Sequence, residues 1–224
     1  MDWIALRLSV ELGLATLAVL LPLALWLGRV LAYRRFPGRS AIEAAIALPL
    51  VLPPTVLGFY LLVGFGAQSP LGRAWEGVFG QGLAFSFEGL VLASVIANLP
   101  FAVQPVRNGF AAVPRRLREA GAVSGLSPLA VLLRIELPLA WPGIATAVVL
   151  TFAHTLGEFG VVLMVGGSIP GETRTIAIAI YDRVQAFDQQ AAGIMSAVLL
   201  ALSLLALGLT GSLSRRIGRQ DGDG

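Results

Sequence analysis

The chain has no cysteine, no lysine and a single histidine, His154, among its 224 residues. Without cysteine it can hold neither a disulfide nor a thiolate metal site, and without lysine it lacks the P-loop that binds nucleotide phosphates. One histidine cannot supply the paired ligands of an HExxH intramembrane metalloprotease. We therefore expect no catalytic residue, no metal site and no cofactor in this chain, so any ATP–Mg must be hydrolysed on a separate subunit.

Charge is also scarce, because 13% of the residues are charged whereas 56% are hydrophobic. A soluble domain carries about 25% charged residues, and a membrane span needs about 20 mostly apolar ones. Long windows without charge predict an all-α polytopic membrane protein with about five transmembrane helices. The expected spans are approximately 8–31, 42–65, 89–110, 140–165 and 189–213, with a possible extra half-helix at 175–184. We interpret the first window as a span rather than a signal peptide, since no basic segment precedes it.

All 16 basic residues are arginine, and their positions predict the orientation. With the N-terminus outside, twelve arginines lie on inner segments and only four lie outside. The inner set is Arg29, Arg34, Arg35, Arg39, Arg107, Arg115, Arg116, Arg118, Arg134, Arg215, Arg216 and Arg219. The positive-inside rule therefore places the N-terminus outside and the C-terminus inside.

Two adjacent prolines, Pro53 and Pro54, lie in the middle of the second expected span. Single prolines are common in transmembrane helices, where they usually serve packing. Two together almost force a break, and broken helices line the substrate route in transporters. We therefore expect Pro53, Pro54 and Thr55 to belong to the pathway or its gate.

The segment 113–138 contains residues typical of the starts and ends of two short helices that meet at a bend. Pro114 suits a first helical turn, Gly125 a C-terminal stop, and Ser127 with Pro128 the start of a second helix. Pro138 is expected to end that second helix. Its expected apolar face should lie in a groove of another protein and consists of Leu129, Leu132, Leu133 and Glu136.

The same segment resembles the EAA loop of the membrane subunits of ABC importers, with the pattern EAA-x3-G-x9-I-x-LP. The matching residues are Glu119, Ala120, Gly121, Gly125, Ile135, Glu136, Leu137 and Pro138. Only Gly121 departs from the pattern, at a helix-propensity cost of about 1 kcal/mol. The resemblance implies a cytoplasmic coupling helix that docks into a cleft on a separate ATPase subunit.

Two other interpretations of this segment are weaker. An amphipathic loop adsorbed to the lipid surface does not explain why Gly125, Ser127 and Pro128 form a helix stop followed by a helix start. A helix-turn-helix that binds DNA is disfavoured because both ends of the segment are tethered to the membrane. We expect no nucleic-acid partner.

Three further stretches resemble the permeases of the molybdate, tungstate and sulfate group: 48–66, 152–160 and 169–182. This resemblance implies a type I ABC importer permease fold in the inner membrane. It also implies a homodimer with two ATPase subunits and an external substrate-binding protein, translocating its anion by alternating access. Molybdate ranks first because the chain is short, with tungstate second and sulfate third.

The fourth expected span carries Thr151, His154, Gly157 and Glu158 as further candidates for the pathway or gate. Ionisable groups inside spans are functional candidates, and these share one helical face. Counted from Pro142, Glu158 lies roughly 24 Å along a core of about 30 Å, near the outer interface. A carboxylate is a poor ligand for an oxyanion, so we expect Glu158 to fix a gate, a helix contact or a docking surface. Gly157, with Gly160, would allow close helix approach.

An outer turn contains Glu172 and Arg174. It has two interpretations: a solvated loop with an internal Glu–Arg pair, or a contact with an external binding protein or a funnel for an anion. The residues leave both open.

Two other function classes were weighed. An ion-coupled secondary transporter would use Glu158 and His154 as a relay and would act without ATP. An intramembrane hydrolase would need one of Ser94, Ser196 or Ser203 as nucleophile, but His154 has no evident serine partner in the sequence.

Overall fold

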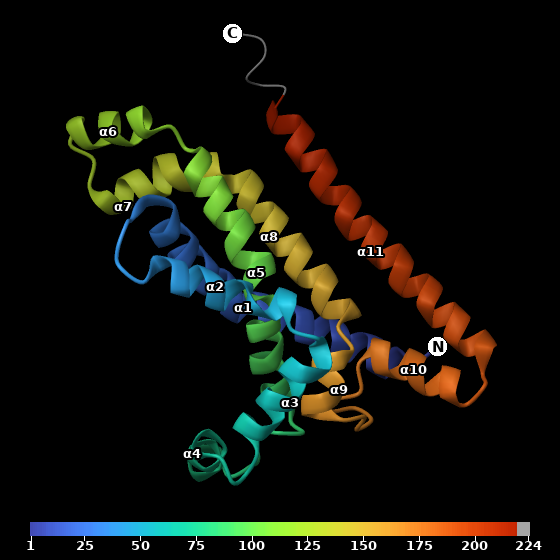
Figure 1. Ribbon diagram of the computed structural model, residues 1–224. Helices are drawn as coiled ribbons and strands as arrows, with labels where there is room; N and C mark the ends of the chain where they lie inside the picture. The colour runs from blue at the N-terminus through green and yellow to red at the C-terminus, as the bar shows by residue number, and fades with distance from the viewer. Residues whose placement is uncertain (219–224) are drawn as a thin grey trace.

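The computed structural model describes residues 1–218, and every regular element in that range is helical (Figure 1). The bounds are α1 Trp3–Tyr33, α2 Arg39–Val51, α3 Pro54–Phe65, α4 Pro70–Phe79, α5 Phe87–Ala112, α6 Arg115–Val123, α7 Pro128–Val131, the π-helical turn η1 Leu132–Glu136, α8 Leu137–Gly157, α9 Gly160–Gly166, α10 Ile176–Gln185 and α11 Gln189–Gly218. The predicted all-α fold class is confirmed. Of the arginines expected on the inner side, Arg219 lies outside the described residues.

Three long helices, α1, α5 and α8, pack against one another and form the core. Small residues line their contacts: Gly28 of α1 faces Val106 of α5, and Gly109 of α5 meets Gly143 of α8. A Cβ on Gly28 would lie only 2.7 Å from Val106. Such close backbone approach stabilises helix pairs in lipid, where burying apolar side chains contributes little.

Three stretches are long and apolar enough to cross a membrane: α1, α5 and the stretch Pro128–Gly157 that ends with α8. The pair α2 and α3 passes the same test as one span bent by 113°. The predicted break at the double proline is therefore present. In α11 the apolar stretch found in the described part, Gln189–Leu205, is shorter. The count of five spans stays a prediction.

The expected span 140–165 is not one helix. α8 begins earlier than predicted and ends at Gly157, Glu158 has extended backbone, and α9 follows after the break. No proline marks this break, but the uncharged window that begins after Glu136 ends at Glu158, which was a usable signal. The half-helix expected at 175–184 is present as α10.

The loop between α3 and α5 contains a helix that was not predicted from the sequence, α4. Its start has the same signal as that of α7: Ser69 accepts a hydrogen bond from the backbone N–H of Gly72 at 2.8 Å, and Pro70 follows directly. In Figure 1, α6 and α7 lie at one end of the core, whereas α4, α9 and α10 lie toward the other.

Candidate functional site

Between Pro114 and Pro128, the segment 113–138 folds as its helix start and stop residues predict. α6 begins directly after Pro114, and Gly125 follows it with φ +80°, a conformation that glycine adopts without strain. The hydroxyl of Ser127 accepts a hydrogen bond from the N–H of Ala130 at 3.2 Å, and Pro128 occupies the first position of α7. The predicted bend is confirmed.

Pro138 does not end the second helix, contrary to the prediction. The chain passes from α7 through η1 into α8 without interruption. The N–H of Leu137 donates to the carbonyl of Leu132, five residues back. This wider turn immediately precedes a proline whose ring, in a regular α-helix, would clash with the carbonyl four residues earlier. The segment 113–138 is therefore continuous with the core helix α8.

Gly121 is the buried residue of α6, and its burial explains its departure from the motif. A Cβ at this position would lie 2.6 Å from Cδ1 of Ile135, so the glycine leaves room for that side chain. The two halves of the motif thus pack against each other. Ala120 and Glu119 face outward, and Glu119 pairs with Arg115 at 2.5 Å.

The expected apolar face of the second helix is divided between two sides. Leu129 and Leu133 are 63% and 55% exposed, as predicted for a surface awaiting a partner. Leu132 packs against the core and Glu136 is 2% exposed, so both were wrongly assigned to that face. The reason is η1, whose wider turn breaks the regular spacing. Val123 of α6, at 88% exposure, adds to the exposed apolar surface.

Glu136 is held by an arginine that is distant in sequence. Its two carboxylate oxygens face Arg29 of α1, with Nε to Oε2 at 2.6 Å and Nη2 to Oε1 at 3.4 Å. Nearby, the guanidinium of Arg118 lies 3.7 Å from the ring centre of Tyr33, whose hydroxyl donates to the carbonyl of Phe110. These contacts fasten the segment 113–138 to the C-terminal end of α1, and no local pattern in the sequence predicts them.

At the other candidate region the two helix breaks meet. A Cβ on Gly160, at the start of α9, would lie 2.7 Å from Cβ of Pro54, at the start of α3. The structure thus brings together the double proline and the end of α8. Pro53, Pro54 and Thr55 are exposed. Gly157 has open space around it, so the expectation that it permits close helix approach is wrong.

A buried polar network joins α5 to α8 beside these breaks. Asn98 has no exposed surface, and its amide nitrogen donates to Oγ1 of Thr155 at 3.1 Å and to the carbonyl of Ser94 at 2.8 Å. Its amide oxygen faces Nδ1 of His154 at 3.1 Å. Oγ1 of Thr155 donates to the carbonyl of Thr151. The sequence analysis missed Asn98, although a carboxamide in the middle of an uncharged window is a usable signal.

The hydrogen bonds assign one proton to the imidazole, because the amide oxygen of Asn98 accepts and Nδ1 of His154 must donate. The other ring nitrogen, Nε2, lies 3.6 Å from Oε2 of Glu158. The second oxygen of Glu158 accepts from the N–H of Val161 at 3.0 Å and thereby caps α9. Phe101 stacks on the imidazole at 4.1 Å.

The two breaks border a cavity of about 200 Å³. Its lining consists of Pro49, Leu50, Leu52, Pro54, Leu57, Ala97, Phe101, His154, Glu158 and Val161. This wall is mostly apolar, and its ionisable groups are an imidazole and a carboxylate. An oxyanion prefers arginines or backbone N–H groups, so the arrangement suits a gate better than a binding site for an anion.

In the turn between α9 and α10, Arg174 pairs with Asp2 at 3.1 Å and not with Glu172, so the internal Glu–Arg pair is absent. The other carboxylate oxygen of Asp2 caps α1 by accepting from the N–H of Ala5. Arg174 thereby fixes the N-terminus to this turn. Glu172 instead lines a cavity of about 520 Å³ together with Glu11 and Glu88.

Comparison with known proteins agrees with this architecture. A family model described as a binding-protein-dependent transport system inner membrane component matches residues 21–219. The chain is 45% identical over 210 residues to a molybdenum transport system permease protein of Azotobacter vinelandii, covering 92% of this chain and 91% of that protein. It is 31% identical over 191 residues to a sulfate transport system permease protein of Escherichia coli strain K12, covering 85% and 69%.

A solved bacterial alginate ABC transporter, in complex with an alginate pentasaccharide-bound periplasmic protein, shares the fold. It superposes with a TM-score of 0.74 at 18% identity, covering 96% of this chain and 78% of that one. The fold, the long apolar helices and the family match agree with one another. The chain belongs to the family of binding-protein-dependent transport system inner membrane components and is a multi-pass permease subunit of an ABC importer.

Proposed function

We propose that this permease imports molybdate, as a homodimer with two ATPase subunits on the inner side and a binding protein outside. The substrate assignment rests on the similarity of the whole chain to the molybdenum permease. This similarity exceeds that to the sulfate permease in both sequence identity and coverage. Tungstate, which has the same charge and shape, is the first alternative, and sulfate is the second. The N-terminus lies outside and the C-terminus inside, as the arginine distribution indicates.

In this proposal the segment 113–138 is a coupling segment, which transmits movements of the ATPase subunits to the core helices. Its exposed apolar side chains, among them Val123, Leu129 and Leu133, offer a surface for a groove on that subunit. Behind them, the Gly121–Ile135 contact and the Arg29–Glu136 pair join the segment to the core. Movement of the docked segment would therefore rotate α8 and α1 as a rigid body, which is what alternating access requires.

The helix breaks act as the gate in this proposal. The break at Pro53 and the break at Glu158 border one cavity, so a rotation of α8 would change both. A secondary transporter with His154 and Glu158 as relay is less well supported, because one oxygen of Glu158 already caps α9. For a hydrolase, the hydrogen bonds recorded for the described side chains place no serine hydroxyl on His154.

The substrate is tested by uptake of labelled molybdate at trace concentration in cells with and without the gene. Gene-dependent uptake that excess tungstate blocks and excess sulfate does not would support the molybdate and tungstate assignment. Competition by sulfate would move the assignment to a sulfate permease. Absence of gene-dependent uptake would overturn the molybdate proposal while leaving the family unchanged.

The coupling role is tested with Gly125→Val and Glu119→Arg in the assembled transporter. Valine is strained at φ +80°, and arginine at position 119 loses the pair with Arg115, so both disturb the docking surface. We expect substrate-stimulated ATPase activity to fall at least tenfold while membrane insertion stays normal. The matched control is Gly38→Ala, which also has positive φ, at 84°, but lies between α1 and α2. Normal stimulation in both test variants would remove the coupling role.

A further inference from the structure

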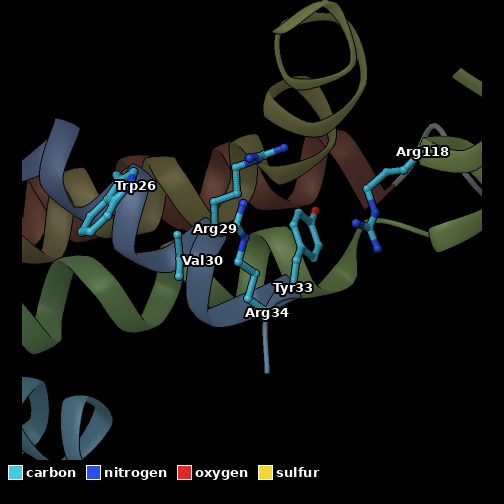
Figure 2. A pocket seen from close by; sticks show the side chains of 6 residues that line it. All are labelled: Trp26, Arg29, Val30, Tyr33, Arg34 and Arg118. Carbon is cyan, nitrogen blue, oxygen red and sulfur yellow. The ribbon is translucent and has the colours of Figure 1, made fainter. Parts of the chain in front are cut away.

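The inner end of α1 borders a cavity of about 400 Å³ beside the coupling segment. Its lining consists of Trp26, Arg29, Val30, Tyr33, Arg34 and Arg118. Figure 2 shows the ring of Tyr33 between Arg29 and Arg34 on one side and Arg118 on the other, with Trp26 farther along α1. The cavity is many times larger than the roughly 30 Å³ that a water molecule occupies in the liquid, so a small ion would leave most of it unfilled.

Positive charge exceeds negative charge around this cavity. Of its three guanidiniums, only that of Arg29 is paired, with Glu136. Arg118 rests on the ring of Tyr33, and its Nε is buried without a hydrogen-bond partner. Within residues 1–205, whose side chains the structure describes, neither Arg34 nor Arg118 has a carboxylate partner. Two unmatched positive charges beside a cavity attract an anion.

The lining also combines apolar and charged side chains along α1. Trp26, at its far end, is 63% exposed, and Arg29 and Val30 lie about one turn farther along the helix toward Arg34. From Trp26 to Arg34 the rise is about 12 Å, so the cavity has an apolar end and a cationic end. A tryptophan beside arginines at the end of a span is typical of the membrane interface. A free oxyanion has no use for the apolar end, whereas an amphiphile fills both.

We propose that this cavity binds the phosphate headgroup of an anionic phospholipid of the inner leaflet, with Arg34 and Arg118 as its ligands. Guanidiniums bind phosphate oxygens in bidentate fashion, and basic pockets between helices on the cytoplasmic side suit such headgroups. Arg34 follows α1 and Arg118 lies in α6, so one phosphate would join the core to the coupling helix. The choice of leaflet rests on the orientation given under the proposed function.

The test measures phosphatidylglycerol bound to the full-length chain, purified in mild detergent with its partner subunits, by native mass spectrometry. The variant R34Q/R118Q removes both unpaired guanidiniums and leaves the Arg29–Glu136 pair intact. Its matched control is R35Q/R116Q, which removes the same charge from the same two segments but from residues outside the lining. Phosphatidylcholine with identical acyl chains provides the uncharged comparison, and molybdate and inorganic phosphate are added as free competitors.

We expect R34Q/R118Q to weaken phosphatidylglycerol binding at least tenfold, because each arginine near the surface contributes about fivefold. The control should stay within about twofold, and phosphatidylcholine should bind equally to all three proteins. An equal loss in both double variants would show diffuse attraction and overturn the site. Displacement of the lipid by millimolar molybdate or phosphate would overturn the lipid as its occupant. Lipid binding does not depend on uptake, so a chain that transports no molybdate but shows the tenfold loss contradicts the proposed function only.

Discussion

Two buried carboxylates flank the core helix α8, and they are held in different ways. Glu136 precedes the helix and is 2% exposed, whereas Glu158 follows it and is 7% exposed. The first is paired with a guanidinium, which stays charged at any physiological pH. The second lies 3.6 Å from an imidazole and accepts from a backbone N–H. The comparison teaches that the end of α8 at Glu136 is held by an ion pair to another core helix, whereas the end at Glu158 is held only by contacts within the break between α8 and α9.

Helix electrostatics differ at the two positions. Glu136 lies inside the uninterrupted helical stretch from α7 through η1 to α8, so Arg29 and not a helix N-terminus stabilises its charge. Glu158 lies at the unfavourable end of α8 but at the favourable end of α9, where it caps the N–H of Val161. Its position is therefore stable only while the break between the two helices keeps its geometry.

Glu136→Gln should have the largest effect on stability. Removing one partner of a buried ion pair costs about 3–5 kcal/mol, and since Arg29 is 37% exposed, we expect about 2 kcal/mol here. The measurement is the free energy of unfolding in detergent with increasing denaturant. The control Glu119→Gln breaks an exposed pair with Arg115 and should cost at most about 0.5 kcal/mol. Equal losses in the two variants would show that the buried Arg29–Glu136 pair holds this end of α8 no more firmly than an exposed pair would.

Glu158→Ala should follow, with a loss of about 1–2 kcal/mol in the same measurement, since it removes a helix cap. Glu158→Gln keeps an oxygen for the N–H of Val161 and removes only the charge, so we expect about half that loss. If the glutamine variant lost as much as the alanine variant, the charge and not the cap would hold the break together.

His154→Phe tests the imidazole that lies beside Glu158. The new ring can still stack on Phe101, but Asn98 and Glu158 each lose a hydrogen-bonding group. We expect a loss of about 1 kcal/mol in the free energy of unfolding and a larger proportional fall in molybdate uptake. Phe101→Leu, which keeps both ring nitrogens in place, is the control. Unchanged uptake with His154→Phe would exclude the imidazole from the gate.

Gly121→Ala should have the smallest effect. Alanine gains about 1 kcal/mol of helix propensity, but its Cβ would press on Cδ1 of Ile135, so the net change should lie within about 0.5 kcal/mol. Shortening the neighbour in the double variant G121A/I135V should recover part of the propensity gain. A large loss of unfolding free energy with Gly121→Ala alone would mean that the side chain of Ile135 cannot move aside for the added methyl group.

Local rules predicted those features that depend on neighbours in sequence. The turn at Gly125, the cap at Ser127 and the break at the double proline each follow from steric demands that a few residues impose by themselves. The uncharged windows likewise indicate helices long enough to span a bilayer. The missed helix α4 belongs to the same class, because its Ser69–Pro70 start could have been found.

Other features depend on partners that are distant in sequence. Arg29 and Glu136 are separated by 107 positions, and Asp2 and Arg174 by 172, so no window contains both partners. The continuation through Pro138 was missed for a different reason. A proline forbids a regular α-turn but permits a wider one, and propensity alone does not distinguish a stop from a bulge.

The wider turn η1 also sets how far α7 is rotated about the helix axis relative to α8. An α-helix advances about 100° per residue, so the one extra residue in the turn rotates α7 by about 100° relative to α8. That rotation places Leu132 and Glu136 against the core and leaves Leu129 and Leu133 on the surface. Deleting one residue from Leu132–Glu136 would turn the outward face of the segment by the same angle while leaving its composition nearly unchanged. The spacing of the motif therefore determines which side of the segment carries Leu129 and Leu133, as well as how far apart its two halves lie.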